Sequence, residues 1–144
     1  MKKLVLLTAL AVSFAFSKPM LTPEVKEMLK EAKQEVSFTK ATELVSLIAD
    51  EKVVVIDVRD PNEWAKGVIK ADKLVKISRG FLEVKYPKLI LKDYDKNDRF
   101  VVYCGIEPRS ILATQTLKKL GFKNVTYLKG GFKNWKKSGL PVIK

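Results

Sequence analysis

Histidine is absent from this 144-residue chain, and cysteine occurs once, as Cys104. With no imidazole and one thiol, the chain cannot form the usual Cys and His zinc sites, an intramolecular disulfide, or a Ser/His/Asp or Cys/His catalytic pair. No apolar run is long enough to span a bilayer, and internal repeats and low-complexity tracts are also missing. The composition, 47% hydrophobic and 31% charged residues, is typical of one soluble globular domain. We predict neither a metal nor a cofactor, which leaves the lone thiol as the group of greatest chemical interest.

The first 17 residues have the pattern of an export signal. Two lysines, Lys2 and Lys3, precede a 13-residue largely apolar run over 4–16, which is followed by Ser17. This run is shorter than the roughly 20 residues that span a bilayer, so we expect cleavage near Lys18, with an uncleaved anchor as the alternative. The short lysine-rich start is typical of bacteria. We therefore predict a periplasmic or secreted protein without stable membrane insertion after cleavage.

The charge is strongly positive. The chain has 28 Lys and Arg against 16 Asp and Glu, and removal of residues 1–17 takes away two lysines and leaves a net charge of +10. The lysines are dispersed, with no arginine-rich or aromatic-interleaved cluster, so we predict no nucleic-acid partner. The charge instead favours attraction of small anions, an acidic partner or an anionic membrane surface.

Helical and extended patterns alternate along the chain. Helices are expected over 22–34, 39–49, 80–91, 110–120 and 131–138, and strands over 53–56, 74–77, 100–103 and 125–128. This order predicts an α/β fold of three layers, in which helices flank a mainly parallel central sheet of about five strands. We expect residues 18–36 to form an N-terminal helical extension and residues 37–144 to form the domain.

Cys104 stands where a predicted strand gives way to a helix. In parallel α/β sheets such loops lie at the carboxyl ends of the strands and direct backbone N–H groups toward what they enclose. The helix N-terminus and the guanidinium of Arg109 would both favour a thiolate at Cys104 and an anion bound above it. A buried structural cysteine is the alternative interpretation of the same residues.

Three motifs stand in order along the chain. The first covers Val55–Arg59, Glu63-Trp64 and Gly67–Ile69; the second is the loop from Tyr103 to Ser110; the third covers Leu128–Phe132, Trp135 and Gly139–Val142. They resemble the motifs of the single-domain rhodaneses, and the match spans residues 53–142. The resemblance implies a rhodanese-like fold and a sulfurtransferase whose cysteine carries a sulfane sulfur as a persulfide. It also implies a small sulfur-containing anion or a persulfide as donor, and a thiol or a protein as acceptor.

The resemblance also assigns roles to residues. Cys104 would be the nucleophile and persulfide carrier. Its cradle would consist of the backbone N–H groups of Gly105, Ile106, Glu107, Arg109 and Ser110. Arg109 would hold the loop and the anionic substrate. Ser110 would cap the helix and form a hydrogen bond inside the bowl, which is the space that the loop encloses. As supporting residues we expect Asp57 and Arg59 to tie the loop down, with Arg59 paired to Glu63, and Arg79 to line the mouth.

The loop also departs from the family pattern. Glu107 stands where the family usually has glycine, and Pro108 lacks an N–H. We expect the Glu107 carboxylate to lie at the rim and to disfavour a dianionic donor such as thiosulfate. Two alternatives to the enzyme stay open: a catalytically silent module for partner binding or sulfur-compound sensing, and a phosphatase. The phosphatase relatives of this fold have one more residue between Cys and Arg, which argues against the second.

Overall fold

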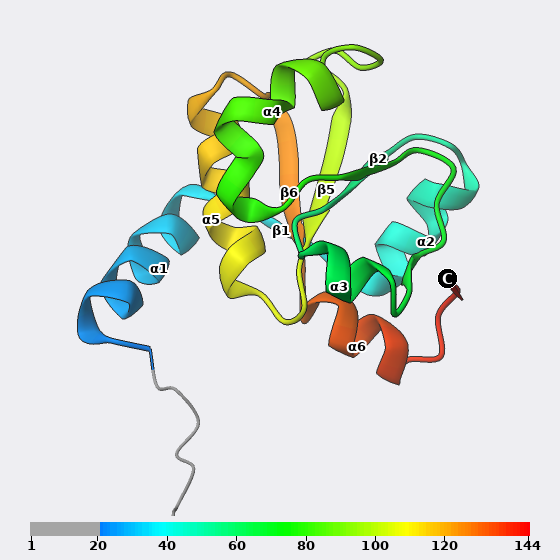
Figure 1. Ribbon diagram of the computed structural model, residues 1–144, viewed down its shortest axis with the longest axis horizontal. Coiled ribbons are helices and arrows are strands. Elements are labelled where there is room, and N and C mark those ends of the chain that lie inside the picture. The colour runs from blue at the N-terminus through cyan, green and yellow to red at the C-terminus, as the bar shows by residue number, and fades with distance from the viewer. Residues whose placement is uncertain (1–20) are drawn as a thin grey trace, which may run out of the picture.

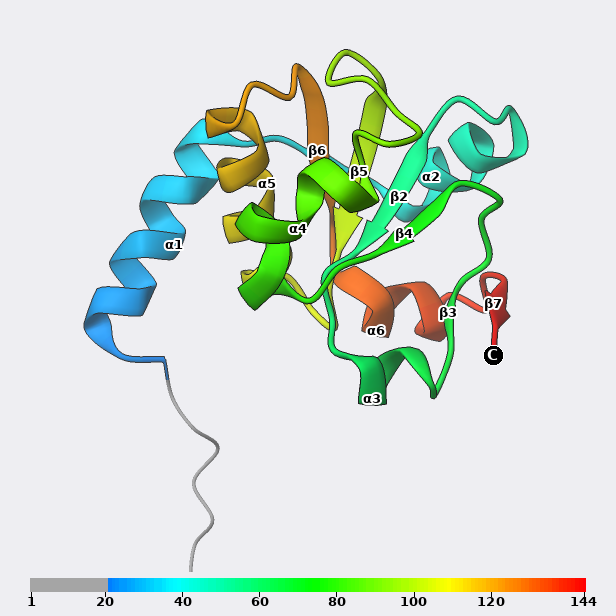
Figure 2. The same ribbon diagram turned by 45° about the horizontal axis from the view of Figure 1, so that its top comes forward.

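A five-stranded parallel sheet forms the centre of the computed structural model, which describes residues 21–144. The predicted export signal over 1–17 lies outside these residues. The strands follow the order β1-β6-β5-β2-β4 (Figures 1 and 2). Their bounds are β1 Phe38–Thr39, β2 Val54–Asp57, β4 Leu74–Lys76, β5 Arg99–Tyr103 and β6 Asn124–Leu128. The predicted α/β class and the mainly parallel sheet of about five strands are thereby confirmed.

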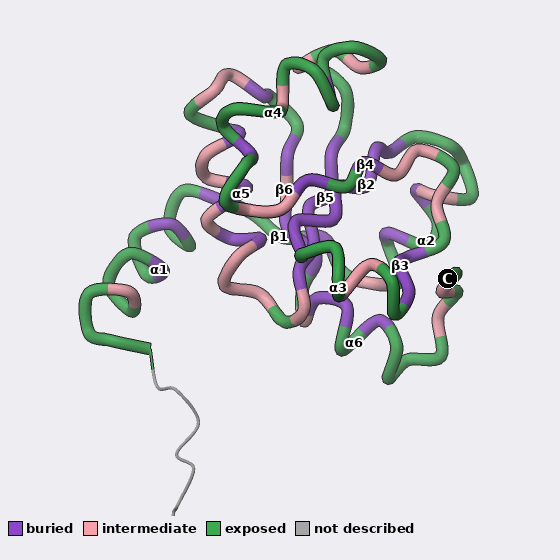
Figure 3. The backbone as a smooth tube through the Cα atoms, in the orientation of Figure 1, coloured by how far each residue is buried: buried purple, intermediate pink, exposed green. Residues whose placement is uncertain are grey.

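Helices cover both faces of the sheet because the central strands are apolar on both sides. In β5, Phe100 and Val102 join one core with α4 and α5, whereas Val101 and Tyr103 join the other core with α2 and α6. The bounds of these helices are α2 Ala41–Ala49, α4 Leu82–Leu89, α5 Pro108–Lys119 and α6 Gly131–Lys137. Figure 3 shows the buried strands running through the middle of the three layers.

The N-terminal helix α1, Pro23–Glu35, packs against α5. Leu29 and Ala32 are buried in a separate cluster with Ile111 and Tyr127 (Figure 1). The next residues differ from the prediction, since Thr39 belongs to β1 and α2 begins only at Ala41. A two-residue strand has no readable periodicity, and its position depends on pairing with β6, where the Thr39 and Thr126 hydroxyls lie 2.7 Å apart.

The sequence analysis missed several short elements near the sheet's carboxyl edge. Strands β3 Val68–Ile69 and β7 Val142–Ile143 form an antiparallel pair. The sequence Asp60-Pro61-Asn62-Glu63 has the pattern of a capped helix start, and the four-residue helix α3, Pro61–Trp64, with its capping box confirms this pattern. The 3-10 turn η1, Arg79–Phe81, lies at the start of the helix expected over 80–91. Across residues 21–144, no helix combines the length and apolarity needed to cross a bilayer.

Candidate active site

Cys104 follows the last residue of β5, and Pro108 is the first residue of α5. The connecting loop therefore consists of residues 104–107, at the carboxyl edge of the sheet, as the sequence predicted. Cys104 itself is buried, with 1% of its surface exposed, and its side chain belongs to the core cluster on the α4 and α5 face.

The N-terminus of α6 fixes the direction of the loop peptides. The N–H groups of Phe132 and Lys133 donate to the carbonyl oxygens of Cys104 and Gly105, at 2.8 and 2.9 Å. Gly131 has a φ of +61°, and a Cβ there would lie 2.2 Å from the Ile106 oxygen. Only glycine allows this close approach. The Gly130-Gly131 doublet is the sequence signal for this contact, which the sequence analysis did not predict.

The loop amides face away from α6. In a trans peptide the N–H points opposite to the C=O, so carbonyls turned toward α6 turn the next N–H groups to the other side. Within residues 21–144 no protein acceptor receives the N–H groups of the five predicted cradle residues, which are Gly105, Ile106, Glu107, Arg109 and Ser110. These donors are thus available for an anionic group near the thiol.

The thiol has a direct partner in Ser110. Cys104 Sγ lies 3.5 Å from Ser110 Oγ, and this hydroxyl donates to the Glu107 carbonyl at 2.9 Å. The predicted hydrogen bond inside the bowl is therefore present. The predicted cap is not, because Glu107 is the N-cap of α5 and Ser110 lies one turn further on. The Ser110 hydroxyl can rotate, and it can donate to a thiolate in place of the carbonyl.

Arg109 is held by two parallel hydrogen bonds to Glu63, at 2.6 and 2.9 Å. The Glu63 carboxylate raises the pKa of Arg109, and the guanidinium in turn lowers the pKa of Glu63. Arg109 Nη2 also lies 3.4 Å from where a Cβ on Gly105 would stand, which places the cation beside the loop. Its side chain is 37% exposed, so an anion can reach it.

The Asp57–Arg59 pair corrects another expectation. Arg59 is bound to Asp57 at 2.7 Å and to the Gly67 carbonyl at 2.8 Å, rather than to Glu63. A salt bridge of Arg59 and Glu63 near the surface was expected, but Arg59 precedes α3 and its side chain is buried. Its guanidinium carbon lies 4.0 Å from the centre of the Phe132 ring. Burial opposes its charge, but Asp57 more than offsets this, and the pKa of Arg59 is raised.

Arg79 is engaged away from the loop. Its guanidinium donates to Glu83 at 3.0 Å and to the Thr116 hydroxyl at 3.1 Å, which ties η1 to α4 and α5. Among the described residues, no hydrogen bond or ion pair joins Arg79 to the cysteine loop. Its hydrogen bonds join η1 to α4 and α5, and its place at the mouth of the site stays a prediction.

Glu107 does not place its carboxylate over the anion cradle. Its Oε1 accepts the Gly130 N–H at 2.8 Å and lies 3.6 Å from Lys129 Nζ, so the side chain points toward the turn between β6 and α6. This is the side to which the loop carbonyls also turn. The expected position of this carboxylate at the rim is therefore wrong, and Lys129 offsets part of its charge. The effect of Glu107 on a dianionic donor stays a prediction.

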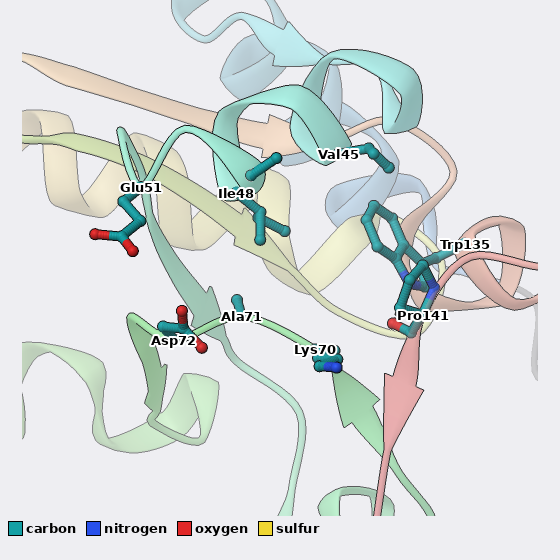
Figure 4. Close-up of a pocket in the computed structure, with 9 residues that line it drawn as sticks. Val45, Ile48, Glu51, Lys70, Ala71, Asp72, Trp135 and Pro141 are labelled. Carbon is teal, nitrogen blue, oxygen red and sulfur yellow. Dashed lines mark hydrogen bonds between the residues drawn. The ribbon is translucent and has the colours of Figure 1, made fainter.

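An apolar hollow of about 300 Å³ lies elsewhere in the molecule, between α2, the β3–β4 connection and Trp135 (Figure 4). Ile48, Ala71 and Pro141 form part of its wall, and no loop residue from 104 to 109 lines it. Trp135 is 1% exposed, and its indole N–H donates to the Pro141 carbonyl at 2.9 Å. Trp135 therefore packs in the core beside the hollow.

Comparison with known proteins gives relatives that are described as having different activities. A "Sulfurtransferase" of Allochromatium vinosum is 31% identical over 93 residues, which cover 65% of this chain and 80% of the relative. A "tRNA uridine(34) hydroxylase" of Buchnera aphidicola is 32% identical over 110 residues, or 74% of this chain and 34% of the relative. The chain thus spans about a third of the hydroxylase's length.

Solved structures are similar over most of the chain. The "30 kDa Polysulfide-sulfur Transferase Homodimer" of Wolinella succinogenes has a TM-score of 0.70 at 31% identity, covering 83% of this chain and 87% of that one. A Rhodopseudomonas palustris protein described as of unknown function, "Possible Tyrosine Phosphatase", has a TM-score of 0.74 at 30% identity, covering 88% and 99%.

Fold and site together define a class of α/β proteins with a cysteine loop at the carboxyl edge of a parallel sheet. The family model described as "Rhodanese-like domain" matches residues 40–138, which is more than half of the chain. The chain belongs to the rhodanese-like domain family, and its homologues include sulfurtransferases.

Proposed function

We propose that this chain is an exported sulfurtransferase that carries sulfane sulfur as a persulfide on Cys104 and transfers it to a thiol or another nucleophile. The observation that carries the proposal is the loop itself. The carbonyls of Cys104 and Gly105 are bound by α6, and the five neighbouring amides have no protein acceptor within residues 21–144. Such preorganised donors stabilise the anions that sulfur transfer passes through.

The first half-reaction loads the cysteine. The Cys104 thiolate attacks the outer sulfur of a donor such as thiosulfate, a new S–S bond forms, and sulfite leaves with the electron pair of the broken S–S bond. The open amides and Arg109 stabilise the terminal anionic sulfur of the persulfide. Ser110 lies 3.5 Å from Sγ and can donate to it in the thiolate state.

The second half-reaction removes the sulfur from the Cys104 persulfide. A nucleophile attacks the terminal sulfur, and the electron pair of the breaking bond returns to Cys104 as a thiolate. No general base is needed for this step when the acceptor arrives as an anion, which accommodates the absence of histidine. The donor and the acceptor are a small sulfur-containing anion or persulfide, and a thiol or a protein.

Intact mass measurement tests the proposal. Protein incubated with thiosulfate, polysulfide or glutathione persulfide should gain about 32 Da, as expected for one added sulfur. Dithiothreitol should remove this added mass. Cys104→Ser should gain nothing. A wild-type protein that resists every donor, and whose thiol alkylates no faster than in denatured protein, would establish the silent module instead.

A phosphatase is the second candidate, favoured by the description of the Rhodopseudomonas palustris structure as a possible tyrosine phosphatase. Against it, four residues separate Cys104 from Arg109, one fewer than the phosphatase relatives of this fold have. Hydrolysis of para-nitrophenyl phosphate that depends on Cys104, without any sulfur loading, would favour this candidate.

The last part of the proposal is that the protein is exported. The pattern over residues 1–17 supports cleavage near Lys18 and a periplasmic or secreted mature protein. N-terminal sequencing of the protein from its source cells should begin close to Lys18. Recovery of Met1 from a membrane fraction would mean that the segment is retained as an anchor.

A further inference from the structure

A groove of about 510 Å³ opens beside the candidate active site, between α3 and the segment formed by η1 and α4. Figure 2 shows where α3 and α4 lie. Its apolar lining comes from both of these walls and the end of β4. It consists of Pro61, Trp64, Ile77, Phe81 and Leu89. The rest of its lining is polar and consists of Ser78 and the charged residues Asp60, Lys76 and Lys85. We call this set of residues the α3–α4 groove.

The α3–α4 groove reaches the cysteine loop through one side chain. Asp60 lies 3.5 Å from Arg109 Nη1, and Arg109 Nη2 lies 3.4 Å from the Cβ position of Gly105, the neighbour of Cys104. A molecule in the groove would therefore end next to the anion cradle. The hollow beside Trp135 has no such connection, because no residue of the cysteine loop lines it.

Two features of the groove define what fits it. Phe81 is 54% exposed although it is a large aromatic residue, and Lys85 Nζ lies 4.3 Å from the centre of its ring. Lys76 Nζ lies 5.7 Å from the Trp64 ring. Neither lysine forms an ion pair with a carboxylate of residues 21–144, whereas Asp60 is matched by Arg109. The complementary ligand is an apolar side chain flanked by carboxylates.

We propose that the α3–α4 groove docks the protein that exchanges sulfur with Cys104, through an acidic segment that carries an apolar anchor next to its reactive thiol. This rests on the sulfurtransferase function proposed above. Thiosulfate or cyanide needs only the cradle and leaves the groove empty. A protein segment fills it, and binding there raises the local concentration of its thiol at the persulfide.

The transfer step is balanced without an added oxidant or reductant. The partner's thiolate attacks the terminal sulfur of the Cys104 persulfide, and a new S–S bond forms on the partner. The original S–S bond breaks, and its electron pair returns to Cys104 as a thiolate. The groove takes no part in the bond changes and acts on the affinity for the partner.

The test uses synthetic thiol peptides as acceptors for the persulfide form of the mature protein. The probe peptide is acetyl-Glu-Phe-Gly-Cys-Gly-Glu-amide. One control peptide has Ser in place of Phe, and the other has Lys in place of both Glu. Mass spectrometry follows the sulfur that each peptide gains. We expect kcat/KM for the probe to exceed that of either control by about tenfold, the scale of one lost anchor or one lost charge pair.

Two double variants in the segment formed by η1 and α4 assign this preference to the groove. Phe81→Ala with Lys85→Ala should lower kcat/KM for the probe about tenfold, through KM, and leave transfer to cyanide unchanged. Val84→Ala with Lys88→Ala is the matched control, because both residues are exposed on α4 and neither lines the groove. It should keep the full preference. Added salt should weaken the probe reaction of the wild type more than that of the groove variant.

The outcomes separate the two proposals. A protein that never loads sulfur fails the mass measurement before any peptide is added, and the sulfurtransferase proposal falls together with the docking role. A protein that loads and transfers sulfur to cyanide, but shows no preference among the peptides, overturns the groove alone. The same holds if the two double variants lose the preference equally.

Discussion

Two arginine–carboxylate pairs stand in this domain with the same chemistry and opposite surroundings. The Arg59 and Asp57 side chains are 3% and 0% exposed, and Arg59 also binds the Gly67 carbonyl and stacks on Phe132. The Arg109 and Glu63 side chains are 37% and 30% exposed and lie beside the cysteine loop. The difference shows how burial decides whether an ion pair holds the fold or stays available to a ligand.

The physical reason lies in desolvation. A buried charge that loses its partner has no water to replace it, so the buried pair is costly to break. A half-exposed pair exchanges its partner for water and contributes little to stability. The chain thus joins β2 to the β3 segment through the first pair and keeps an accessible guanidinium near the thiol through the second.

Asp57→Asn should give the largest effect, because it leaves the Arg59 guanidinium buried without a counter-ion. We expect the free energy of unfolding to fall by about 3–5 kcal/mol, measured by urea denaturation. Asp50→Asn is the matched control, since it breaks an exposed pair with Lys52. It should leave the urea midpoint unchanged. Equal effects of the two variants would contradict the contrast drawn here.

Arg109→Lys should lower activity strongly and stability little, which is the opposite of Asp57→Asn. A lysine is a point charge and cannot make both hydrogen bonds to Glu63, so the cation near the loop loses its fixed position. We expect kcat/KM for sulfur transfer from thiosulfate to cyanide to fall about 10–100-fold, while stability changes by less than about 1 kcal/mol. Full activity in this variant would show that Arg109 does not act on the substrate.

Glu107→Gly should weaken the fold without improving the site. The variant removes the acceptor of the Gly130 N–H, so we expect a loss of about 1–2 kcal/mol in the free energy of unfolding. Glu107→Gln keeps a side-chain acceptor and should lose less. A carboxylate at the rim, as expected from the sequence, would instead give a roughly fivefold or greater gain in kcat/KM for thiosulfate when its charge is removed. Such a gain would show that the carboxylate faces the cradle after all.

The smallest effect concerns pH. Arg109 lowers the pKa of Glu63 in the folded state, so the unfolded chain binds this proton more readily. The stabilisation from the pair is therefore present above the ordinary glutamate pKa and is lost as the pH falls through the lowered one. The part of the free energy of unfolding that is lost toward acid pH for this reason is less than about 1 kcal/mol, and Glu63→Gln should abolish it. Thermal unfolding between about pH 3 and 6 measures this difference. An identical slope in both proteins would mean that the pair is not formed in solution.

The longer elements could be predicted because each carries its own signal. The run Val54-Val55-Ile56 is apolar and β-branched at every position, and it is buried on both faces as expected. Pro61 and Pro108 stand at the first positions of α3 and α5, where a missing N–H is harmless. The cysteine loop lies between β5 and α5 for the same local reasons.

The sequence by itself determined the order of the main helices and strands, the parallel arrangement of the sheet, and the position of Cys104 at its carboxyl edge. These follow from local periodicity and from the turn residues between the elements. Only the tertiary structure decided which carboxylate each arginine meets, where Glu107 points, and that α3 and α4 enclose a groove beside the loop. Such contacts join residues far apart in the chain, or turn on whether a side chain faces inward, and the spacing of residues carries no information about either.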